Sequence, residues 1–164
     1  MDTKEFREHL LKIDRYSDSD WAQQLSSRKK EEIELHDKKK DLDRRKNLKQ
    51  SDVSVYKKYF GSIKFYEQTN ISKSYVNDWV EKHSPGKVFL DYACGNGKHA
   101  IRAAQSGASL AVGIDITAKA IHNARTDAKN KDVENNVVFL VSDAENTEIP
   151  DNTFDLVICD GVLH

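Results

Sequence analysis

Four short apolar runs in the second half of the chain constrain its fold more than any other feature. They are continuous rather than alternating in polarity, as expected for strands that are covered on both faces. The runs are Val88–Leu90, Leu110–Ile114, Val137–Val141 and Leu156–Cys159. Helix-like segments over 97–105 and 117–131 separate the first three runs. Strands that alternate with helices predict an α/β fold with a doubly wound parallel sheet and right-handed crossovers.

Each apolar run ends in an aspartate or reaches one within two residues. These aspartates are Asp91, Asp115, Asp143 and Asp160. In a parallel sheet the carboxyl ends of the strands meet at one edge, where open α/β sheets bind their ligands. One aspartate there would be unremarkable, since aspartate caps helices and starts turns. Four in register need a cation, hydrogen-bond donors or solvent to offset their mutual repulsion.

The loop over 91–97 joins the first run to a helix and contains two glycines. Gly95 and Gly97 permit a tight turn and close backbone approach, and the helix start offers free N–H groups. Dinucleotide-binding folds use a similar loop, and Ala100 in place of a third glycine is a tolerated variant, so the glycines discriminate little. Asp91 discriminates better. Its carboxylate would repel a pyrophosphate, whereas it suits a ligand that bears an ammonium and a sulfonium.

The later aspartates have the spacing of a nucleoside site. Asp115 follows Asp91 by 24 residues and stands where an acid accepts hydrogen bonds from both ribose hydroxyls. At the end of the third run, the Asp143 side chain and the Ala144 backbone N–H can read the edge of an adenine. Ile116 can pack on the purine face, and an ordinary role in the core explains it equally well.

These segments resemble the motifs of the class I S-adenosylmethionine (SAM)-dependent methyltransferases. The family's motif I is similar to VFLDYACGNG, with Ala93 where many members have the first glycine. Its ribose-binding motif is similar to GIDIT, and its adenine and fourth-strand motifs are similar to VSDAENTEIPDNTFDLVICDGVLH. In the last segment, Pro150 and the run Phe154–Val157 are typical of members that act on small molecules. The resemblance covers residues 86–164.

The resemblance implies a Rossmann-like fold, of which this sequence supplies about four of seven strands, and SAM as the cofactor. It implies that Asp91 and the main-chain carbonyl of Asp160 lie near the methionine ammonium, and that the Gly95 backbone approaches the methionine part. It gives Asp115 the ribose, and Asp143 with Ala144 the adenine. The predicted cofactor-binding residues are Asp91, Ala93, Gly95, Gly97, Asp115, Ile116, Asp143, Ala144 and Asp160.

The sequence assigns neither a general base nor a metal site. His164 follows the fourth run, where family members often have two histidines, and we favour a helix-start role for it. His99 is expected to be a surface or helix-dipole residue. Cys159 stands in neither of the motifs of nucleic-acid methyltransferases and is interpreted as a buried strand thiol.

Ahead of residues 86–164, which form the SAM-binding half of the domain, we expect two segments. Residues 1–50 predict a charged helical extension, in which Phe6 and Leu10 share one helix face. Residues 51–85 predict a helical cap or lid. Family members often fold this part over the cofactor, so three residues are candidates for the cofactor carboxylate or the substrate, although packing under the lid is favoured. The three are Tyr56, Lys64 and Tyr66.

A basic stretch from Arg28 to Lys49 holds ten Lys or Arg residues against six Asp or Glu residues. Such a stretch can bind RNA or anionic lipid. A solvated helix face held by pairs of alternating sign is the favoured interpretation. The near absence of aromatic residues also counts against nucleic acid, because bases stack on aromatic side chains.

Composition narrows the remaining possibilities. A net charge of −1 gives no global attraction to nucleic acid or to a membrane surface. No apolar run approaches the length that spans a bilayer, and the first residues lack the apolar stretch of a signal peptide. The two cysteines, Cys94 and Cys159, are interpreted as reduced thiols. These observations predict a cytoplasmic protein.

The sequence therefore predicts transfer of a methyl group from SAM to a small-molecule acceptor. Because only four of the seven family strands are present, we expect a truncated form with weak SAM binding and little or no turnover. The first alternative is a non-catalytic SAM-binding or scaffold remnant. A nicotinamide-dependent oxidoreductase and an RNA methyltransferase are further alternatives, disfavoured by Asp91 and by the lack of aromatics respectively.

Overall fold

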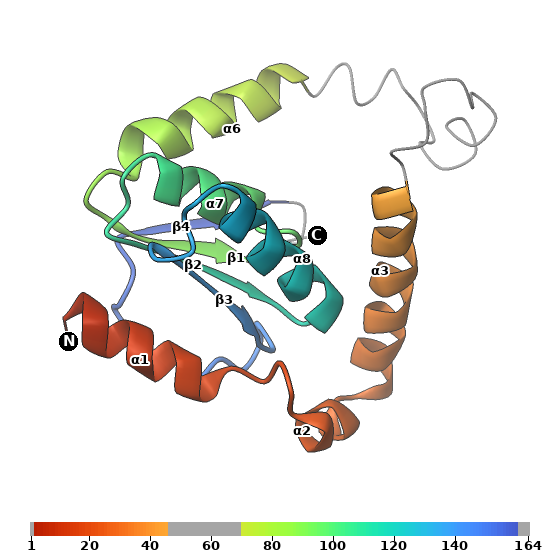
Figure 1. Ribbon diagram of the computed structural model, residues 1–164. Coiled ribbons are helices and arrows are strands. Elements are labelled where there is room, and N and C mark those ends of the chain that lie inside the picture. The colour runs from red at the N-terminus through yellow and green to blue at the C-terminus, as the bar shows by residue number, and fades with distance from the viewer. Residues whose placement is uncertain (1, 46–69, 161–164) are drawn as a thin grey trace.

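A computed structural model of the protein describes residues 2–45 and 70–160 (Figure 1). The helices in these ranges are α1 (Thr3–Ile13), α2 (Ser19–Gln24), α3 (Ser27–Arg45), α6 (Asn70–His83), α7 (Lys98–Gln105) and α8 (Ala118–Asn130). The strands are β1 (Val88–Tyr92), β2 (Leu110–Asp115), β3 (Val137–Val141) and β4 (Leu156–Cys159). The predicted roles of Tyr56, Lys64, Tyr66 and His164 fall outside the described residues.

The four predicted strands form one parallel sheet in the order β3-β2-β1-β4. The register pairs Asp91 of β1 with Gly113 of β2, and Asp115 at the end of β2 with Val141 at the end of β3. On the other side of β1, Tyr92 pairs with Cys159 of β4. The predicted α/β parallel sheet is confirmed, and its register brings the carboxyl ends of all four strands to one edge.

Helices cover both faces of this sheet (Figure 1). On one face α6, α7 and α8 pack against side chains such as Phe89 and Phe139. On the other face α1 packs against their strand neighbours Leu90 and Leu140. Successive residues of a strand point to opposite faces, so continuous apolar runs are buried only because both layers are present.

Helix α1 covers its face of the sheet through Phe6 and Leu10, which are 3% and 0% exposed. The helix begins with a capping box in which the Glu5 backbone N–H donates to the Asp2 side chain at 2.8 Å. Phe6 meets the ring of Phe154 edge to face, with centroids 5.8 Å apart. The predicted shared helix face is therefore confirmed, and it is the face that closes the apolar core.

Helix α6 lies within the segment 51–85, for which the sequence predicts a cap. Of that segment the structure describes residues 70–85. Val80 of α6 is fully buried in the core shared with α7 and α8, while Tyr75 is 69% exposed. The described part of this segment therefore belongs to the helical layer over the sheet.

No helix in the described ranges is both long enough and apolar enough to cross a membrane.

We expect Leu10→Ala to lower the free energy of unfolding by about 2–5 kcal/mol, because it removes a fully buried side chain between α1 and the sheet. Leu11→Ala provides the matched control, because Leu11 is 56% exposed, and it should change stability by less than about 0.5 kcal/mol. Urea unfolding of both variants measures the difference. Equal losses would show that α1 does not close the core.

Candidate functional site

A cavity of about 470 Å³ opens at the carboxyl edge of the sheet. This volume is within the usual range for small-molecule sites. The predicted cofactor residues that line it are Ala93, Gly95, Asp115, Ile116, Asp143, Ala144 and Asp160. Four strands and their loops thus contribute to one site, as expected for this edge of a parallel sheet. Asp91 and Gly97 are not among the lining residues.

The loop after β1 takes three left-handed backbone conformations, at Ala93, Gly95 and Gly97, with φ of 55°, 54° and 73°. Glycine adopts such angles freely, whereas an alanine pays about 1–2 kcal/mol. Ala93 therefore adopts the left-handed conformation although this position has a side chain.

Asp115 is fixed by three donors from its surroundings. Its Oδ2 accepts from the Gly95 backbone N–H at 2.8 Å. Its Oδ1 accepts from the backbone N–H of Thr117 at 2.9 Å and from the Thr117 hydroxyl at 2.5 Å. A carboxylate offers about four acceptor positions, so Asp115 can accept one further hydrogen bond from a ligand in the cavity. Its orientation is set before any ligand arrives.

Asp91 lies beneath the glycine loop and is 2% exposed. One carboxylate oxygen accepts from the backbone N–H of Ala100, at the start of α7, at 3.1 Å. Burial raises the pKa of Asp91 to about 7, and the nearby charges of Asp160 and Asp115 act in the same direction, although backbone donors oppose them. A ligand cation above the loop would favour the ionised form.

Gly97 is required for packing. A Cβ built on Gly97 would overlap the ring of Phe139 on β3, which lies under the start of α7. The left-handed φ of 73° adds a second restriction. The glycine therefore allows α7 to approach the sheet closely, and its effect on the cavity is indirect.

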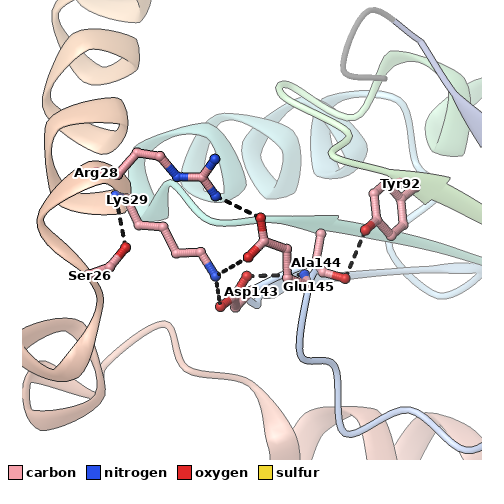
Figure 2. A network of polar contacts seen from close by, with 7 residues as sticks. All are labelled: Ser26, Arg28, Lys29, Tyr92, Asp143, Ala144 and Glu145. Atoms are coloured by element: carbon pink, nitrogen blue, oxygen red, sulfur yellow. Dashed lines mark hydrogen bonds and ion pairs between the residues drawn. The ribbon is translucent and has the colours of Figure 1, made fainter. Parts of the chain in front are cut away.

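The end of β3 carries a polar network that joins it to α3, a helix more than a hundred residues earlier in the chain (Figure 2). Lys29 of α3 contacts Asp143 Oδ2 at 2.5 Å and Glu145 at 2.8 Å. Beside them, the Tyr92 hydroxyl donates to the Ala144 carbonyl at 2.8 Å. Burial raises the pKa of Tyr92, so this phenol stays protonated as a donor.

His99 is 7% exposed, so the expectation of a surface position is wrong. Its Nε2 lies 3.2 Å from Asp160 Oδ2, and its Nδ1 is buried without a partner among the described residues. Burial lowers the pKa of His99, which outweighs the opposite effect of Asp160. The histidine is thus buried in the first turn of α7, beside Asp160 at the end of β4.

Helix α3 provides a wall of the cavity that the sequence did not predict. Lys29, Glu32 and His36 line the cavity, and their spacing places them on one face of the helix. The sequence shows this helical spacing of polar residues, but the same spacing is equally compatible with a helix face that is exposed to solvent. His36 Nε2 lies 4.0 Å from Glu32 Oε1. When the histidine is protonated, the two form an ion pair within the helix, as predicted for pairs of alternating sign. Lys29, by contrast, pairs outside its helix.

A family model described as a methyltransferase domain matches residues 83–164, which is half of the chain. The chain belongs to this family, the class I SAM-dependent methyltransferases. The predicted family resemblance is thus confirmed, and SAM is the cofactor of the family.

Two curated relatives show how far this similarity extends. The chain is 40% identical over 82 residues to the ribosomal protein L11 methyltransferase of Ralstonia pickettii, covering 49% of this chain and 26% of the relative. It is 39% identical over 79 residues to the 27-O-demethylrifamycin SV methyltransferase of Amycolatopsis mediterranei, covering 48% and 29%. The match therefore spans little more than a quarter of the length of these relatives.

Solved structures are similar over about half of this chain. The YcgJ protein of Bacillus subtilis is 27% identical, with a TM-score of 0.48, and the match covers 52% of this chain and 37% of that one. An RNA methyltransferase of Salinibacter ruber in complex with S-adenosyl-L-homocysteine is 28% identical, with a TM-score of 0.46, and the match covers 51% and 56%.

We expect Asp91→Asn to stabilise the ligand-free chain at pH 8. A folded-state pKa of about 7, above the ordinary 3.8, means that stability is lost as the pH rises between these values. Asparagine keeps an acceptor for the Ala100 N–H without the buried charge. The free energy of unfolding of the variant minus that of the wild type should increase by roughly 2–3 kcal/mol from pH 5 to pH 8. Urea unfolding at both values tests this, and a constant difference would contradict it.

Gly97→Ala is expected to destabilise the chain by more than about 2 kcal/mol, since the added methyl overlaps Phe139 and the left-handed backbone disfavours alanine. Gly86→Ala is a suitable control. Gly86 has a similar φ of 71°, but a Cβ there meets nothing within 4 Å. If thermal unfolding shows equal losses for both variants, close packing at Gly97 is not the cause.

Proposed function

We propose that this chain forms the cofactor-binding half of a methyltransferase that moves the SAM methyl group to a small-molecule acceptor. The observation that carries the proposal is the convergence of Asp115, Asp143 and Asp160 from three strands on one cavity. Backbone from the glycine loop lines the same cavity at Ala93 and Gly95. A nucleoside with a positively charged tail matches this set of groups.

At the β2 end of the cavity, Asp115 would hold the ribose. Its carboxylate is oriented by Gly95 and Thr117 and keeps one acceptor position for a hydroxyl donor. Ile116 lines the cavity next to it and would pack on the adenine. Preorganisation lowers the entropy cost of binding, because the acceptor does not need to be immobilised by the ligand.

At the β3 end, Asp143 and the Ala144 backbone would read the adenine edge. Asp143 Oδ1 accepts from the Glu145 backbone N–H at 3.1 Å, which fixes the carboxylate at the start of the loop. The carboxylate then accepts from the exocyclic amine of an adenine, and such charge-assisted hydrogen bonds are among the stronger ones.

At the β1 and β4 ends, Asp91 and Asp160 make the environment suitable for the ammonium and sulfonium groups. SAM, when bound, supplies an electrophilic methyl group on a sulfonium whose leaving group is a neutral thioether. The protein contributes alignment of the two reactants and a site from which water is excluded. The described residues contain no unambiguous general base for the acceptor.

For the acceptor, we favour a small molecule over RNA because the start of the basic stretch is occupied within the protein. Arg28 contacts Glu145 at 2.8 Å, Lys29 contacts Asp143, and the Lys30 ammonium donates to the Gln23 carbonyl at 2.6 Å. Cations held in this way release few counterions from a phosphate backbone. Salt-dependent binding of a single-stranded RNA would argue for the nucleic-acid alternative.

We expect SAM and S-adenosylhomocysteine (SAH) to bind the chain, and Asp115→Asn to weaken both by roughly 10–100-fold, since it removes a charged acceptor of the ribose hydroxyls. Isothermal titration calorimetry measures this loss. Asp151→Asn is the matched control, because Asp151 is exposed on a loop and is not among the cavity residues. It should bind like the wild type.

Binding of NAD without binding of SAM or SAH would overturn the proposal in favour of an oxidoreductase. Binding of SAM without release of SAH in the presence of pooled small-molecule acceptors would favour a binding-only role.

A further inference from the structure

The ammonium of Lys29 sits where the proposed cofactor would place its adenine. It contacts Asp143 at 2.5 Å and Glu145 at 2.8 Å, and all three residues line the cavity (Figure 2). Lys29 and Asp143 are 114 residues apart in the chain. The carboxylates at the adenine end of the site are thus already paired with a cation of the protein itself.

Burial distinguishes this contact from an ordinary surface ion pair. The side chains of Lys29 and Asp143 are 15% and 13% exposed, whereas those of Arg28 and Glu145 in the neighbouring pair are 75% and 62% exposed. Exposed pairs contribute little because water and salt screen them. A largely buried pair is screened less, and removal of one partner leaves a charge without compensation.

Two features of the chain hold Lys29 in place. Ser26 accepts the Lys29 backbone N–H at its hydroxyl, 3.4 Å away, and so caps the first turn of α3. Further back, the segment between α1 and α2 is tied to the end of β3, where the Val141 N–H donates to Asp14 at 2.9 Å and the Arg15 N–H donates to the Val141 carbonyl at 3.1 Å. The start of α3 is therefore anchored close to Asp143 by its own chain.

The two oxygens of Asp143 are both engaged. Oδ1 accepts from the Glu145 backbone, and Oδ2 faces the Lys29 ammonium. An adenine amine and the Lys29 ammonium would compete for the same oxygen and the same part of the cavity. Two donors cannot occupy the same place beside Oδ2, so binding of the nucleoside there requires the Lys29 side chain to withdraw. Its withdrawal removes the contacts that tie the first turn of α3 to the end of β3.

We propose that Lys29 and the first turn of α3 form an autoinhibitory latch, which occupies the adenine end of the cofactor site and must open for the cofactor to bind. This inference rests on the proposed function. A protein whose binding-competent state is only partly populated binds its ligand more weakly by that fraction. The latch thus sets the cofactor concentration at which the site fills.

Calorimetric titration of the full chain with SAH tests the latch. Lys29→Met should tighten SAH binding about tenfold, because the ion pair no longer competes for Asp143. Lys29→Arg keeps a cation and should stay close to the wild type. The matched control is Lys30→Met, which removes the same charge from an adjacent exposed residue whose ammonium contacts the Gln23 carbonyl. It should leave the affinity unchanged within about twofold.

A second readout follows the latch directly. SAH should accelerate amide hydrogen exchange at the start of α3, over residues 28–33, while it slows exchange in the loop over 93–97. In the Asp143→Asn background, Lys29→Met should change the affinity less than twofold, because the competing contact has already been weakened. Far-UV circular dichroism establishes that each variant is folded.

The outcomes separate the latch from the proposed function. If the wild type binds SAH and Lys29→Met binds equally or more weakly, or if SAH protects α3 from exchange, the latch is wrong and the proposed function stands. If neither chain binds SAH or SAM, both are overturned. Binding by Lys29→Met that exceeds that of the wild type supports both.

Discussion

The parallel register of β1 with its neighbours is the constraint on which the rest of the structure depends. It places the ends of β1, β2, β3 and β4 at one edge, so residues that are tens of positions apart line one cavity. That register is maintained only while both faces of the sheet are covered, since the strands are apolar on both sides. The cavity at this edge therefore depends on helices that do not line it.

The N-terminal extension contributes to both the core and the site. Helix α1 buries Phe6 and Leu10 against the sheet face opposite α7 and α8. Beyond it, the chain is tied to the end of β3 through Asp14 and Arg15 and then presents α3 at the cavity. One segment thus contributes both to the covered face of the sheet and to the wall of the cavity at its carboxyl edge.

The charges at this edge are arranged in two different ways. Asp91 is buried with only backbone donors nearby, and its pKa is raised, so it is poised to ionise when a cation arrives. Asp115 and Asp143 are instead held by donors from the protein. Thr117 and backbone N–H groups donate to Asp115, and Lys29 donates to Asp143. The mutual repulsion that the sequence predicts is therefore reflected in the raised pKa of Asp91 and is offset by pairing at Asp115 and Asp143.

The sequence alone determined the parallel sheet, the glycine loop and most residues of the cavity. These features depend on local patterns, namely apolar runs, glycine spacing and an aspartate after each strand, which hold wherever the strands are paired. Tertiary structure alone decided that α1 closes one face of the sheet, that Gly97 serves packing against Phe139, that His99 is buried, and that Lys29 reaches Asp143. The physical reason is that an amphipathic or charged helix has the same pattern whether its partner is solvent or a surface more than a hundred residues away, and only the folded chain selects between them.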